Sequence, residues 1–520
     1  MRFSDLLAEL PAELSATELL KTNASDDPVV RGIAYDSRAV SPGDVFVALR
    51  GAVVDGHDYL EQAVELGAAA LVVESATLAS SPANCPVAIV PDARRALAPI
   101  SACFYGEPAS ECQLVGVTGT NGKTSTTYLV ESILASAGVH TGLIGTVEIR
   151  YAGEHQPAVN TTPESLDLQR LLRAMVTSGV EAVVMEVSSH GLELGRVAGC
   201  QFRVAAFTNL TQDHLDFHGS MDAYLDSKAR LFRDHLIAGG EAVINIDDPA
   251  SEKLIAIARD SGSRLWRCSR EASSDAELRL IDSNVSIDGT RAKLAWPDGE
   301  TLEVSMPLIG DFNLENLMVA CGIAAALGIS PETVERGVAN CPQIPGRMER
   351  VFASDRAKPA PTVLVDYAHT PDAVDKLLAS VHPLAQEAGR LIVVFGCGGD
   401  RDSAKRPLMA NAVARHADCA IATSDNPRTE NADAILVDVE SGLSAMTRVE
   451  ATELASTDGS YVVVRDRREA IDRALGAARS EDTIVIAGKG HEDYQIIGRE
   501  KLPFDDRVEA QRALDAWNAS

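Results

Sequence analysis

Short apolar runs recur along this chain, and their spacing predicts a protein built from alternating strands and helices. Near the N-terminus, residues 45–49 and 70–73 form strand-like runs. Farther along, residues 183–187 and 204–207 are apolar without alternation, which is typical of parallel strands buried on both faces. A short β-rich insertion is expected between about residues 265 and 306. The pattern therefore predicts an α/β fold with parallel sheets.

The last third of the chain repeats this pattern with four apolar runs. They lie near residues 363–365, 391–395, 420–423 and 483–487, and each runs directly into a polar or glycine-rich segment. In doubly wound α/β sheets, ligands bind outside the carboxyl ends of the strands. We therefore expect binding residues in the segments that follow these four strands.

Turn-forming residues divide the chain into three domains. Residues 105–108 (Tyr-Gly-Glu-Pro) indicate a boundary, and the proline- and glycine-containing segment 342–347 indicates a hinge. A length of 520 residues also suits about three domains. The predicted domains are a small N-terminal α/β domain, a central P-loop mononucleotide-binding α/β domain and a C-terminal Rossmann-like α/β domain, over residues 1–108, 109–345 and 346–520.

Composition narrows the classes of partner. Asp and Glu number 75 against 47 Lys and Arg, which gives a net charge of −28. Such a surface repels polyanions and anionic membranes, so we expect no nucleic-acid partner and no membrane insertion. The nine cysteines form no C-x-x-C pair, and no apolar run reaches about 18 residues. We expect a cytoplasmic protein with reduced thiols that acts as a monomer on small molecules.

The segment 116–125 carries the strongest chemical signal. It follows an apolar run and precedes a helical pattern, which is the arrangement that wraps backbone N–H groups around nucleotide phosphates. Gly119 and Gly122 would let the backbone approach the phosphates, Lys123 would neutralise them, and the Thr124 hydroxyl would reach Mg²⁺. The spacing departs from a standard P-loop, because Val117 occupies the first glycine position.

Two further strand ends could hold a hard cation beside this loop. Glu186 ends an apolar run, and His214 lies in the polar segment that follows another. A carboxylate and an imidazole placed there fit Mg²⁺. His214 and His218 have the i, i+4 spacing of zinc ligands, but no H-E-x-x-H pattern accompanies them, so zinc is not expected.

The polar segments of the last third could hold an amino acid. Arg401 and Arg428 can clamp carboxylates, while Asp425, Asn426 and Glu492 can receive an ammonium group. The alternative is that Asp-Asn-Pro-Arg at 425–428 is only a turn, which its composition also fits. The residues alone leave these two interpretations open.

Taken in order, ten blocks resemble the Mur ligase family, in the branch that adds diaminopimelate. They cover residues 119–124, 160–162, 185–191, 208–216, 311–316, 346–349, 366–372, 398–401, 425–428 and 488–492. The resemblance spans essentially the whole chain. It implies an ADP-forming ligase of cytoplasmic peptidoglycan precursor synthesis, with ATP as co-substrate and Mg²⁺ as cofactor. Its other substrates would be meso-2,6-diaminopimelate and UDP-N-acetylmuramoyl-L-alanyl-D-glutamate.

The resemblance also implies a role for individual residues. ATP would be bound by Gly119, Thr120, Asn121, Gly122, Lys123, Thr124, Ser125, Asn316, Arg347 and Asp366. The UDP substrate would be bound by the loop after Gly51 and by Tyr35, Ser37, Asn160, Thr161, Thr162, Ser188 and Arg196. Diaminopimelate would be bound by Arg401, Asp425, Asn426, Pro427, Arg428, Gly488 and Glu492.

Catalysis would depend on Lys123, Lys228, Glu186 and His214. Lys228 matches the lysine that this family carbamylates, and as N6-carboxylysine it would join Thr124, Glu186 and His214 as a metal ligand. Ser125 replaces a threonine common in the family, and Leu194 replaces a polar substrate contact of some relatives. Three alternatives remain: the same ligation with L-lysine, a folylpolyglutamate synthase-like ligase, and a regulatory ATP-binding module.

Overall fold

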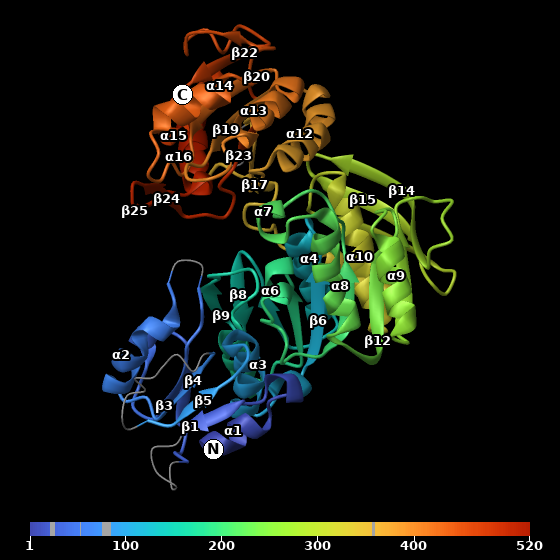
Figure 1. Cartoon of the computed structure of the whole chain (residues 1–520). Coiled ribbons are helices and arrows are strands. Elements are labelled where there is room, and N and C mark those ends of the chain that lie inside the picture. Colours follow the sequence, from blue (N-terminus) through green and yellow to red (C-terminus); the bar gives the residue numbers. More distant parts are fainter. Residues whose placement is uncertain (21–26, 52–53, 75–84, 356–358, 520) are drawn as a thin grey trace. The chain divides into compact units, whose positions relative to one another are not determined.

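The computed structural model of the chain describes residues 1–20, 27–51, 54–74, 85–355 and 359–519. Within these ranges the chain forms two compact units (Figure 1). Unit 1 contains Met1–Leu280, Ala295–Thr301 and Asn316–Gly337, and unit 2 contains Ile281–Leu294, Leu302–Glu315 and Val338–Ser520. Residues 52–53, in the loop expected to contact the UDP substrate, lie outside the described residues.

Unit 1 begins with a five-stranded sheet in the order β1-β5-β4-β3-β2. Strands β2 to β5 are parallel, and β1 is antiparallel to β5. The strands are β1 (Glu18–Leu20), β2 (Gly32–Ala34), β3 (Asp44–Val47), β4 (Ala70–Val73) and β5 (Val87–Ile89). The helices are α1 (Phe3–Ala8), α2 (Leu60–Glu65) and α3 (Ala93–Phe104). The strand expected at 70–73 is confirmed, and the one expected at 45–49 ends two residues earlier.

The larger sheet has eleven strands, and the part that lies mainly in unit 1 runs in the order β13-β12-β11-β6-β10-β7-β8-β9. Its parallel centre consists of strands whose buried residues are almost all apolar, as the uninterrupted hydrophobic runs predict. The strands are β6 (Gln113–Thr118), β7 (Thr141–Ile144), β8 (Glu148–Tyr151), β9 (Glu154–Pro157), β10 (Ala182–Glu186), β11 (Phe202–Phe207), β12 (Leu236–Asn245) and β13 (Arg264–Ser269). The expected β-rich insertion is confirmed as β14 (Leu278–Ser286), β15 (Gly289–Ala295) and β16 (Thr301–Met306).

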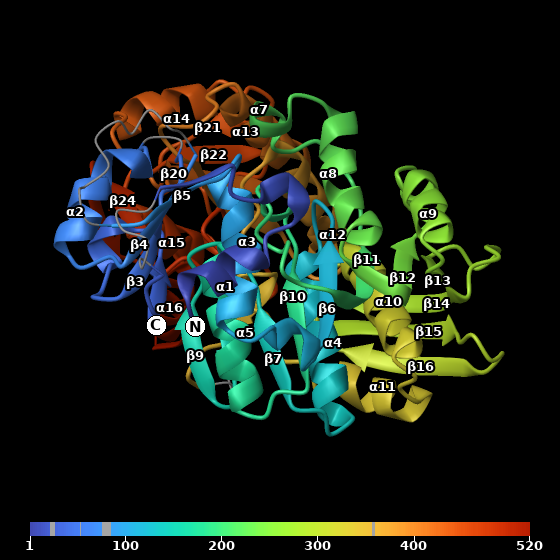
Figure 2. The ribbon, with the colours of Figure 1, turned by 60° about the horizontal axis from the view of Figure 1, so that its bottom comes forward.

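Helices alternate with the strands of this sheet along the chain, and the loops between them contain the candidate site residues. They are α4 (Lys123–Ser136), α5 (Ser165–Thr177), α6 (Ser189–Glu193), α7 (Leu215–His218), α8 (Met221–Arg233), α9 (Ser251–Asp260), α10 (Phe312–Ala326) and α11 (Pro331–Ala339). Helix α5 packs against α3 of the N-terminal sheet, as Figure 2 shows, so the two sheets of unit 1 are joined through helices.

Unit 2 contains a seven-stranded sheet in the order β17-β18-β23-β19-β20-β22-β21, parallel except for β17. Its strands are β17 (Glu349–Val351), β18 (Thr362–Asp366), β19 (Leu391–Cys397), β20 (Cys419–Ser424), β21 (Thr447–Arg448), β22 (Ser460–Val463) and β23 (Thr483–Ala487). Its helices are α12 (Pro371–Gln386), α13 (Lys405–His416), α14 (Ala432–Glu440), α15 (Arg467–Ala477) and α16 (Asp506–Ala519). All four strands predicted for this part of the chain are present.

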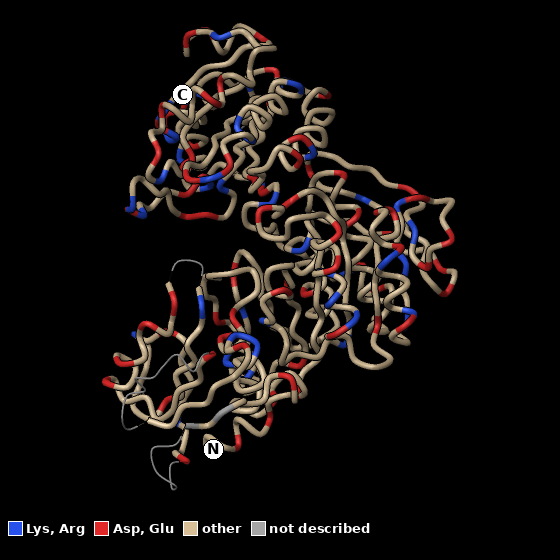
Figure 3. Tube along the Cα trace, viewed as in Figure 1, with Lys and Arg blue, Asp and Glu red and all other residues tan. Residues whose placement is uncertain are grey.

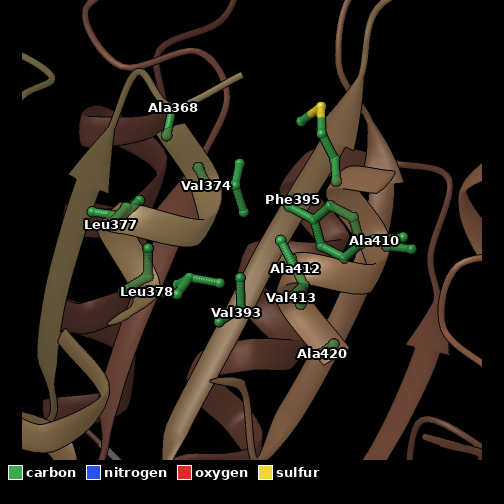
Figure 4. Close-up of a cluster of buried hydrophobic side chains, with 14 of the residues drawn as sticks. Ala368, Val374, Leu377, Leu378, Val393, Phe395, Ala410, Ala412, Val413 and Ala420 are labelled. Carbon is green, nitrogen blue, oxygen red and sulfur yellow. The ribbon is translucent and has the colours of Figure 1, made fainter. Parts of the chain in front are cut away.

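Apolar side chains fill both faces of the unit 2 sheet. One cluster packs helices α12 and α13 onto β19 through Val374, Leu377, Val393, Phe395 and Val413 (Figure 4). Fully burying one such side chain contributes about 1.5–3 kcal/mol. This packing holds the strands whose carboxyl ends lead into the loops described below.

Other features bear on the expectations from composition. An antiparallel hairpin of β24 (Tyr494–Ile497) and β25 (Glu500–Pro503) follows the last strand of the unit 2 sheet and is absent from the sequence predictions. Figure 3 shows Asp and Glu scattered over both units. None of the helices in the described ranges is long and apolar enough to cross a membrane. The α/β fold class with a P-loop domain and a Rossmann-like C-terminal domain is confirmed.

Candidate active site

The glycine-rich segment forms a tight loop between β6 and α4. Gly119 has φ +151° and Gly122 has φ +86°, conformations that L side chains rarely adopt. A Cβ on Gly119 would lie 1.9 Å from Thr208 Oγ1, and one on Gly122 would lie 2.1 Å from Asn316 Oδ1. Helix α4 begins at Lys123, directly after the loop, so its first N–H groups face the position expected for phosphates. The structure also brings Asn316 to this loop.

The segment after β11 braces the loop from the other side. Asn209 accepts a hydrogen bond from Thr120 N at its carbonyl (2.8 Å) and one from Asn121 N at its Oδ1 (2.9 Å). Thr208 Oγ1 donates to Asn121 O at 2.7 Å. Because both strands end at the same edge of the sheet, these contacts fix the loop's backbone without using its own side chains.

Two lysines converge on one carbonyl of the loop. Lys123 Nζ donates to Gly119 O (3.0 Å) and Thr120 O (2.8 Å), while Lys228 Nζ, from α8, donates to Gly119 O at 2.8 Å. Lys228 is buried, 1% exposed, and its ammonium lies 4.2 Å from the centre of the Tyr224 ring. Burial, and then the charge of Lys123, hold the pKa of Lys228 well below its usual range. Lys228 is therefore not the exposed lysine that a charged position on an amphipathic helix usually is.

Glu186 lies beside the first turn of α4. It is buried, and it accepts hydrogen bonds from Thr124 Oγ1 (3.0 Å) and from the backbone and hydroxyl of Thr146 (2.8 and 2.9 Å). Thr124 and Ser125 are also buried there. The hydroxyl and the carboxylate expected to serve Mg²⁺ are thus in direct contact, and both offer the oxygen atoms that hard cations prefer.

His214 belongs to a group of aromatic side chains near α7. Its ring centre lies 4.8 Å from that of His190, and His190 lies 5.6 Å from His218. Burial, together with the other two imidazoles, lowers the pKa of His190 to about 4. In the described part of the chain, no three His, Cys, Asp or Glu side chains gather closely enough to hold a metal ion by themselves. A cation here would need oxygen atoms from a bound substrate.

The residues expected to hold the muramoyl-dipeptide part form one hydrogen-bonded group. Thr162 Oγ1 donates to Glu186 O (3.0 Å) and accepts from Ser188 N (3.0 Å), and Arg196 Nη1 donates to Thr162 O (3.0 Å). Thr161 Oγ1 lies 3.0 Å from Thr146 Oγ1, next to Glu186. Asn160 is exposed at the start of this segment. The carboxylate to be activated would therefore lie close to the phosphate loop.

Tyr35 and Ser37, the two predicted UDP-substrate residues of the N-terminal sheet, directly follow β2. Tyr35 donates from its hydroxyl to Asp167 Oδ2 on α5 at 2.6 Å, and burial followed by this contact raises the pKa of Tyr35. Ser37 is buried and donates to Gln62 Oε1 at 2.9 Å. Tyr35 thus ties the N-terminal sheet to the helix that follows the 160–162 segment.

Unit 2 contains the remaining predicted ATP residues. Asp366, at the end of β18, accepts hydrogen bonds from Met348 N and Ala368 N, each at 2.8 Å. Burial raises the pKa of Asp366, and the positive charge of Arg347 opposes this shift. The Arg347 guanidinium lies 4.9 Å from the centre of the Tyr367 ring. A cation, a carboxylate and an aromatic ring therefore meet at one strand end, while Gly488 N donates to Asp366 O at 3.0 Å.

The 425–428 segment is a turn held on three sides. Arg428 has φ +51°, a strained conformation for a residue with a side chain, and its Nη1 donates to Gly399 O at 2.7 Å. Its backbone N donates to Ile496 O of the hairpin at 3.1 Å. Pro427 is buried against Gly399, where a Cβ would lie 2.0 Å from Pro427 O. Arg401 is exposed in the neighbouring loop.

Asp425, Asn426, Gly488 and Glu492 lie together around this turn. Asn426 Nδ2 donates to Glu492 Oε2 at 2.9 Å, and a Cβ on Gly488 would lie 3.5 Å from Asp425 Oδ2. Two carboxylates, an amide and the Arg428 guanidinium thus lie at one sheet edge, as an amino-acid site requires. A turn begins at Pro427, whose carbonyl accepts a hydrogen bond from Glu430 N at 3.1 Å, and the role of the segment in binding an amino acid stays a prediction.

Sequence reasoning missed several residues that shape these sites. It assigned no role to Tyr224 or Lys489. Tyr224 precedes Lys228 by four residues, a helical spacing that could have indicated the contact. Lys489 was covered by the Gly488–Glu492 block, but nothing in the sequence indicates that it is buried.

Comparison with known proteins gives consistent results over the whole chain. The family models for the Mur ligase family catalytic domain, the Mur ligase middle domain and the Mur ligase glutamate ligase domain match residues 29–105, 117–324 and 346–490. A Geobacillus thermodenitrificans protein is 44% identical over 99% of each chain. A Gloeobacter violaceus protein is 46% identical over 96% of this chain and 97% of its own. Both are named UDP-N-acetylmuramoyl-L-alanyl-D-glutamate--2,6-diaminopimelate ligase.

Solved structures give the same picture of the fold. A structure of a UDP-N-acetylmuramoyl-L-alanyl-D-glutamate--2,6-diaminopimelate ligase is 33% identical, covers 94% of this chain and 96% of its own, and aligns with a TM-score of 0.66. MurF ligase from Thermotoga maritima, solved with ADP, has a TM-score of 0.63 at 17% identity, covering 94% of this chain and 98% of its own. Folylpolyglutamate synthase of Mycobacterium tuberculosis has a TM-score of 0.59 at 20% identity, covering 76% and 92%. The last two likenesses concern the fold alone.

Proposed function

This chain belongs to the Mur ligase family, and we propose that it is an ATP-dependent ligase that joins meso-2,6-diaminopimelate to UDP-N-acetylmuramoyl-L-alanyl-D-glutamate. The observation that carries the proposal is the group of Asp425, Asn426, Arg428 and Glu492 at one edge of the unit 2 sheet. Two carboxylates and a guanidinium group suit the second amino-acid end of diaminopimelate, which bears an ammonium and a carboxylate. L-Lysine lacks that second carboxylate, so Arg428 favours diaminopimelate.

The reaction follows from the chemistry of a poor acyl donor. ATP would transfer its γ-phosphoryl group to the D-glutamyl carboxylate, giving ADP and an acyl phosphate. The neutral amine of diaminopimelate would then attack the acyl carbon, the amide bond would form, and phosphate would leave with the loss of a proton. Lys123 and the first turn of α4 would stabilise the charge on the transferring group, and Arg347 and Asp366 would hold the nucleotide.

Mg²⁺ fits the donor atoms found beside the loop. Thr124 and Glu186 offer oxygen atoms in direct contact, and we assign His214 as a further, nitrogen ligand. Bound there with ATP, Mg²⁺ would neutralise phosphate charge. We further assign Lys228 as N6-carboxylysine, since its depressed pKa favours the neutral amine that reacts with CO₂. Domain limits at 108/109 and 345/346 are likewise our assignment, as are the cytoplasmic site of action and the monomeric state.

A substrate panel tests the proposed function. Phosphate release should require ATP, the UDP-muramoyl-dipeptide and diaminopimelate together, and L-lysine should support it poorly. The control is the same panel with glutamate and a folate, which would support turnover by a folylpolyglutamate synthase. If the rate of ATP hydrolysis depends on neither the nucleotide-sugar peptide nor the amino acid, the result would instead favour a regulatory ATP-binding module.

Changing Arg428 to Ala should weaken the binding of diaminopimelate and leave the binding of ATP nearly unchanged. The loss of one bidentate partner for a carboxylate costs about 2–5 kcal/mol, which corresponds to an increase of about 30-fold or more in the KM for diaminopimelate. The KM for ATP should change much less. Steady-state kinetics with each substrate varied in turn provide the measurement.

Arg448→Ala is the matched control for this variant. Arg448 pairs with Glu440 on the same unit but is 63% exposed, and surface pairs contribute little. Its kinetics should match those of the wild type. If Arg428→Ala weakens all three substrates equally, the arginine only supports the turn and does not bind the amino acid.

Ala at Glu186 or His214 should lower turnover, and added Mg²⁺ should partly restore it. Removing one ligand weakens the binding of Mg²⁺, and a higher Mg²⁺ concentration fills the weaker site by mass action. Turnover as a function of Mg²⁺ concentration provides the measurement. His155→Ala, on the exposed β9 hairpin, should show no such dependence. Zinc should not replace Mg²⁺ well, and tightly bound zinc in elemental analysis would contradict the assignment.

A further inference from the structure

Lys489 is a fully buried ammonium in the middle of the proposed amino-acid site. Its side chain is 0% exposed. Its Nζ lies 3.3 Å from Asp425 Oδ1, 3.1 Å from Asn426 Oδ1 and 3.2 Å from Glu492 Oε2. A buried charge is costly unless it is paired and hydrogen-bonded. The three surrounding groups therefore offset the cost of burying the Lys489 charge.

The hydrogen-bonding capacity of this ammonium is fully used. A lysine ammonium has three N–H donors and no acceptor, and three acceptors lie within bonding distance. Nothing remains for a ligand. Lys489 therefore acts on a bound amino acid only through the three side chains that it holds.

Each of the two carboxylates has one oxygen that does not contact Lys489. The second carboxylate oxygens, Asp425 Oδ2 and Glu492 Oε1, accept no hydrogen bond from any residue in the described ranges. Asn426 is fixed in orientation, because its Oδ1 also accepts from Ile496 N at 2.9 Å and its Nδ2 donates to Glu492. The arrangement leaves two carboxylate oxygens available to a donor.

The charges of the group match a single ammonium. Asp425 and Glu492 carry two negative charges against one positive charge on Lys489. The nearby Arg467 does not change this balance, since it is paired with Asp506 at 2.7 Å and both are fully buried. Within Asp425, Glu492 and Lys489 one negative charge therefore remains for an ammonium group of the ligand, while the positive charge of Arg428 is left for a ligand carboxylate.

We propose that Lys489 is a positioning residue of the amino-acid site. Its buried ammonium holds Asp425, Asn426 and Glu492 so that the remaining carboxylate oxygens receive the ammonium group of diaminopimelate that does not react. The proposal rests on the proposed function, and it assigns Lys489 a role in recognising that second ammonium rather than in the chemical step.

The test compares two amino acids in the full-length enzyme. 2-Aminopimelate keeps both carboxylates and the reacting amine of diaminopimelate but lacks the second amine. Wild-type enzyme should prefer diaminopimelate, measured as the ratio of the two KM values. Lys489→Met should raise the KM for diaminopimelate at least tenfold, move that ratio toward one, and leave the KM for ATP within twofold.

Lys501→Met is the matched control. Lys501 lies over the Tyr494 ring at 3.7 Å on the exposed hairpin, near the same site but outside the buried group. Its KM ratio should equal that of the wild type. Because Lys489→Met buries two unbalanced carboxylates, the charge-balanced Lys489→Met/Glu492→Gln variant provides a second test. It should unfold at a higher temperature than Lys489→Met, and Lys489→Met itself should still be folded at the assay temperature when its KM ratio is measured.

The outcomes separate this inference from the proposed function. If wild-type enzyme shows no diaminopimelate-dependent phosphate release, the proposed function is wrong. If wild-type enzyme uses diaminopimelate and Lys489→Met keeps the same KM ratio, only the role of Lys489 is wrong. An equal rise in the KM values of all three substrates with an unchanged ratio would also overturn it, since that result indicates a purely structural residue.

Discussion

Lys123→Ala is expected to reduce ligation at least about 10³-fold while the protein stays folded, which is the effect of removing one strong electrostatic contact to a transition state. The lysine is only partly buried, and its ammonium bonds to the loop carbonyls of Gly119 and Thr120 rather than packing in a core. The measurement is phosphate release at saturating substrates, with thermal unfolding to confirm the fold.

Lys253→Ala provides the matched control for Lys123→Ala. Lys253 is an exposed lysine of the same unit that pairs with Asp226 at 3.5 Å. Its removal should leave turnover unchanged. Near-normal turnover in a folded Lys123→Ala variant would instead show that the 116–125 loop does not hold the phosphates.

Lys228→Ala is expected to be nearly inactive, and short carboxylic acids should partly restore it. A carbamate would turn this buried amine into an anion with two oxygen atoms for a cation. Forming it needs the neutral amine, which burial and the charge of Lys123 favour by lowering the pKa of Lys228. A carboxylic acid in the space left by the side chain would supply similar oxygens. Turnover should therefore rise with acid concentration.

The same acids should have no effect on Lys123→Ala, which keeps the lysine at position 228. Two results would contradict the carbamate: Lys228→Ala that retains most of its activity, or a bare amine at Lys228 in a crystal of active enzyme equilibrated with CO₂. Loss of activity without rescue would leave Lys228 as an essential amine that supports the loop through Gly119 O.

Local signals in the sequence were enough for the phosphate loop and for the strands around it. Positive φ angles at two positions of the loop favour glycine there, and Gly119 and Gly122 occupy them. The helix begins directly after this turn, at Lys123. The roles of these three residues could therefore be predicted from the local sequence. Buried parallel strands show as uninterrupted apolar runs, and this predicted the sheet of unit 2. Neither hairpin, β8–β9 or β24–β25, was predicted, because one strand of each is exposed throughout and gives no such signal.

The sequence by itself determined the α/β class, the phosphate loop, the residue types available at the strand ends and, through motif resemblance, the family. Only the tertiary structure decided which of those residues lie buried against one another. Nothing in the residues around Lys228 and Lys489 indicates burial, yet both are buried, and each donates to a group more than 60 residues away. Burial and pairing arise where separate strand ends meet at one sheet edge, and no local pattern of residues encodes that meeting.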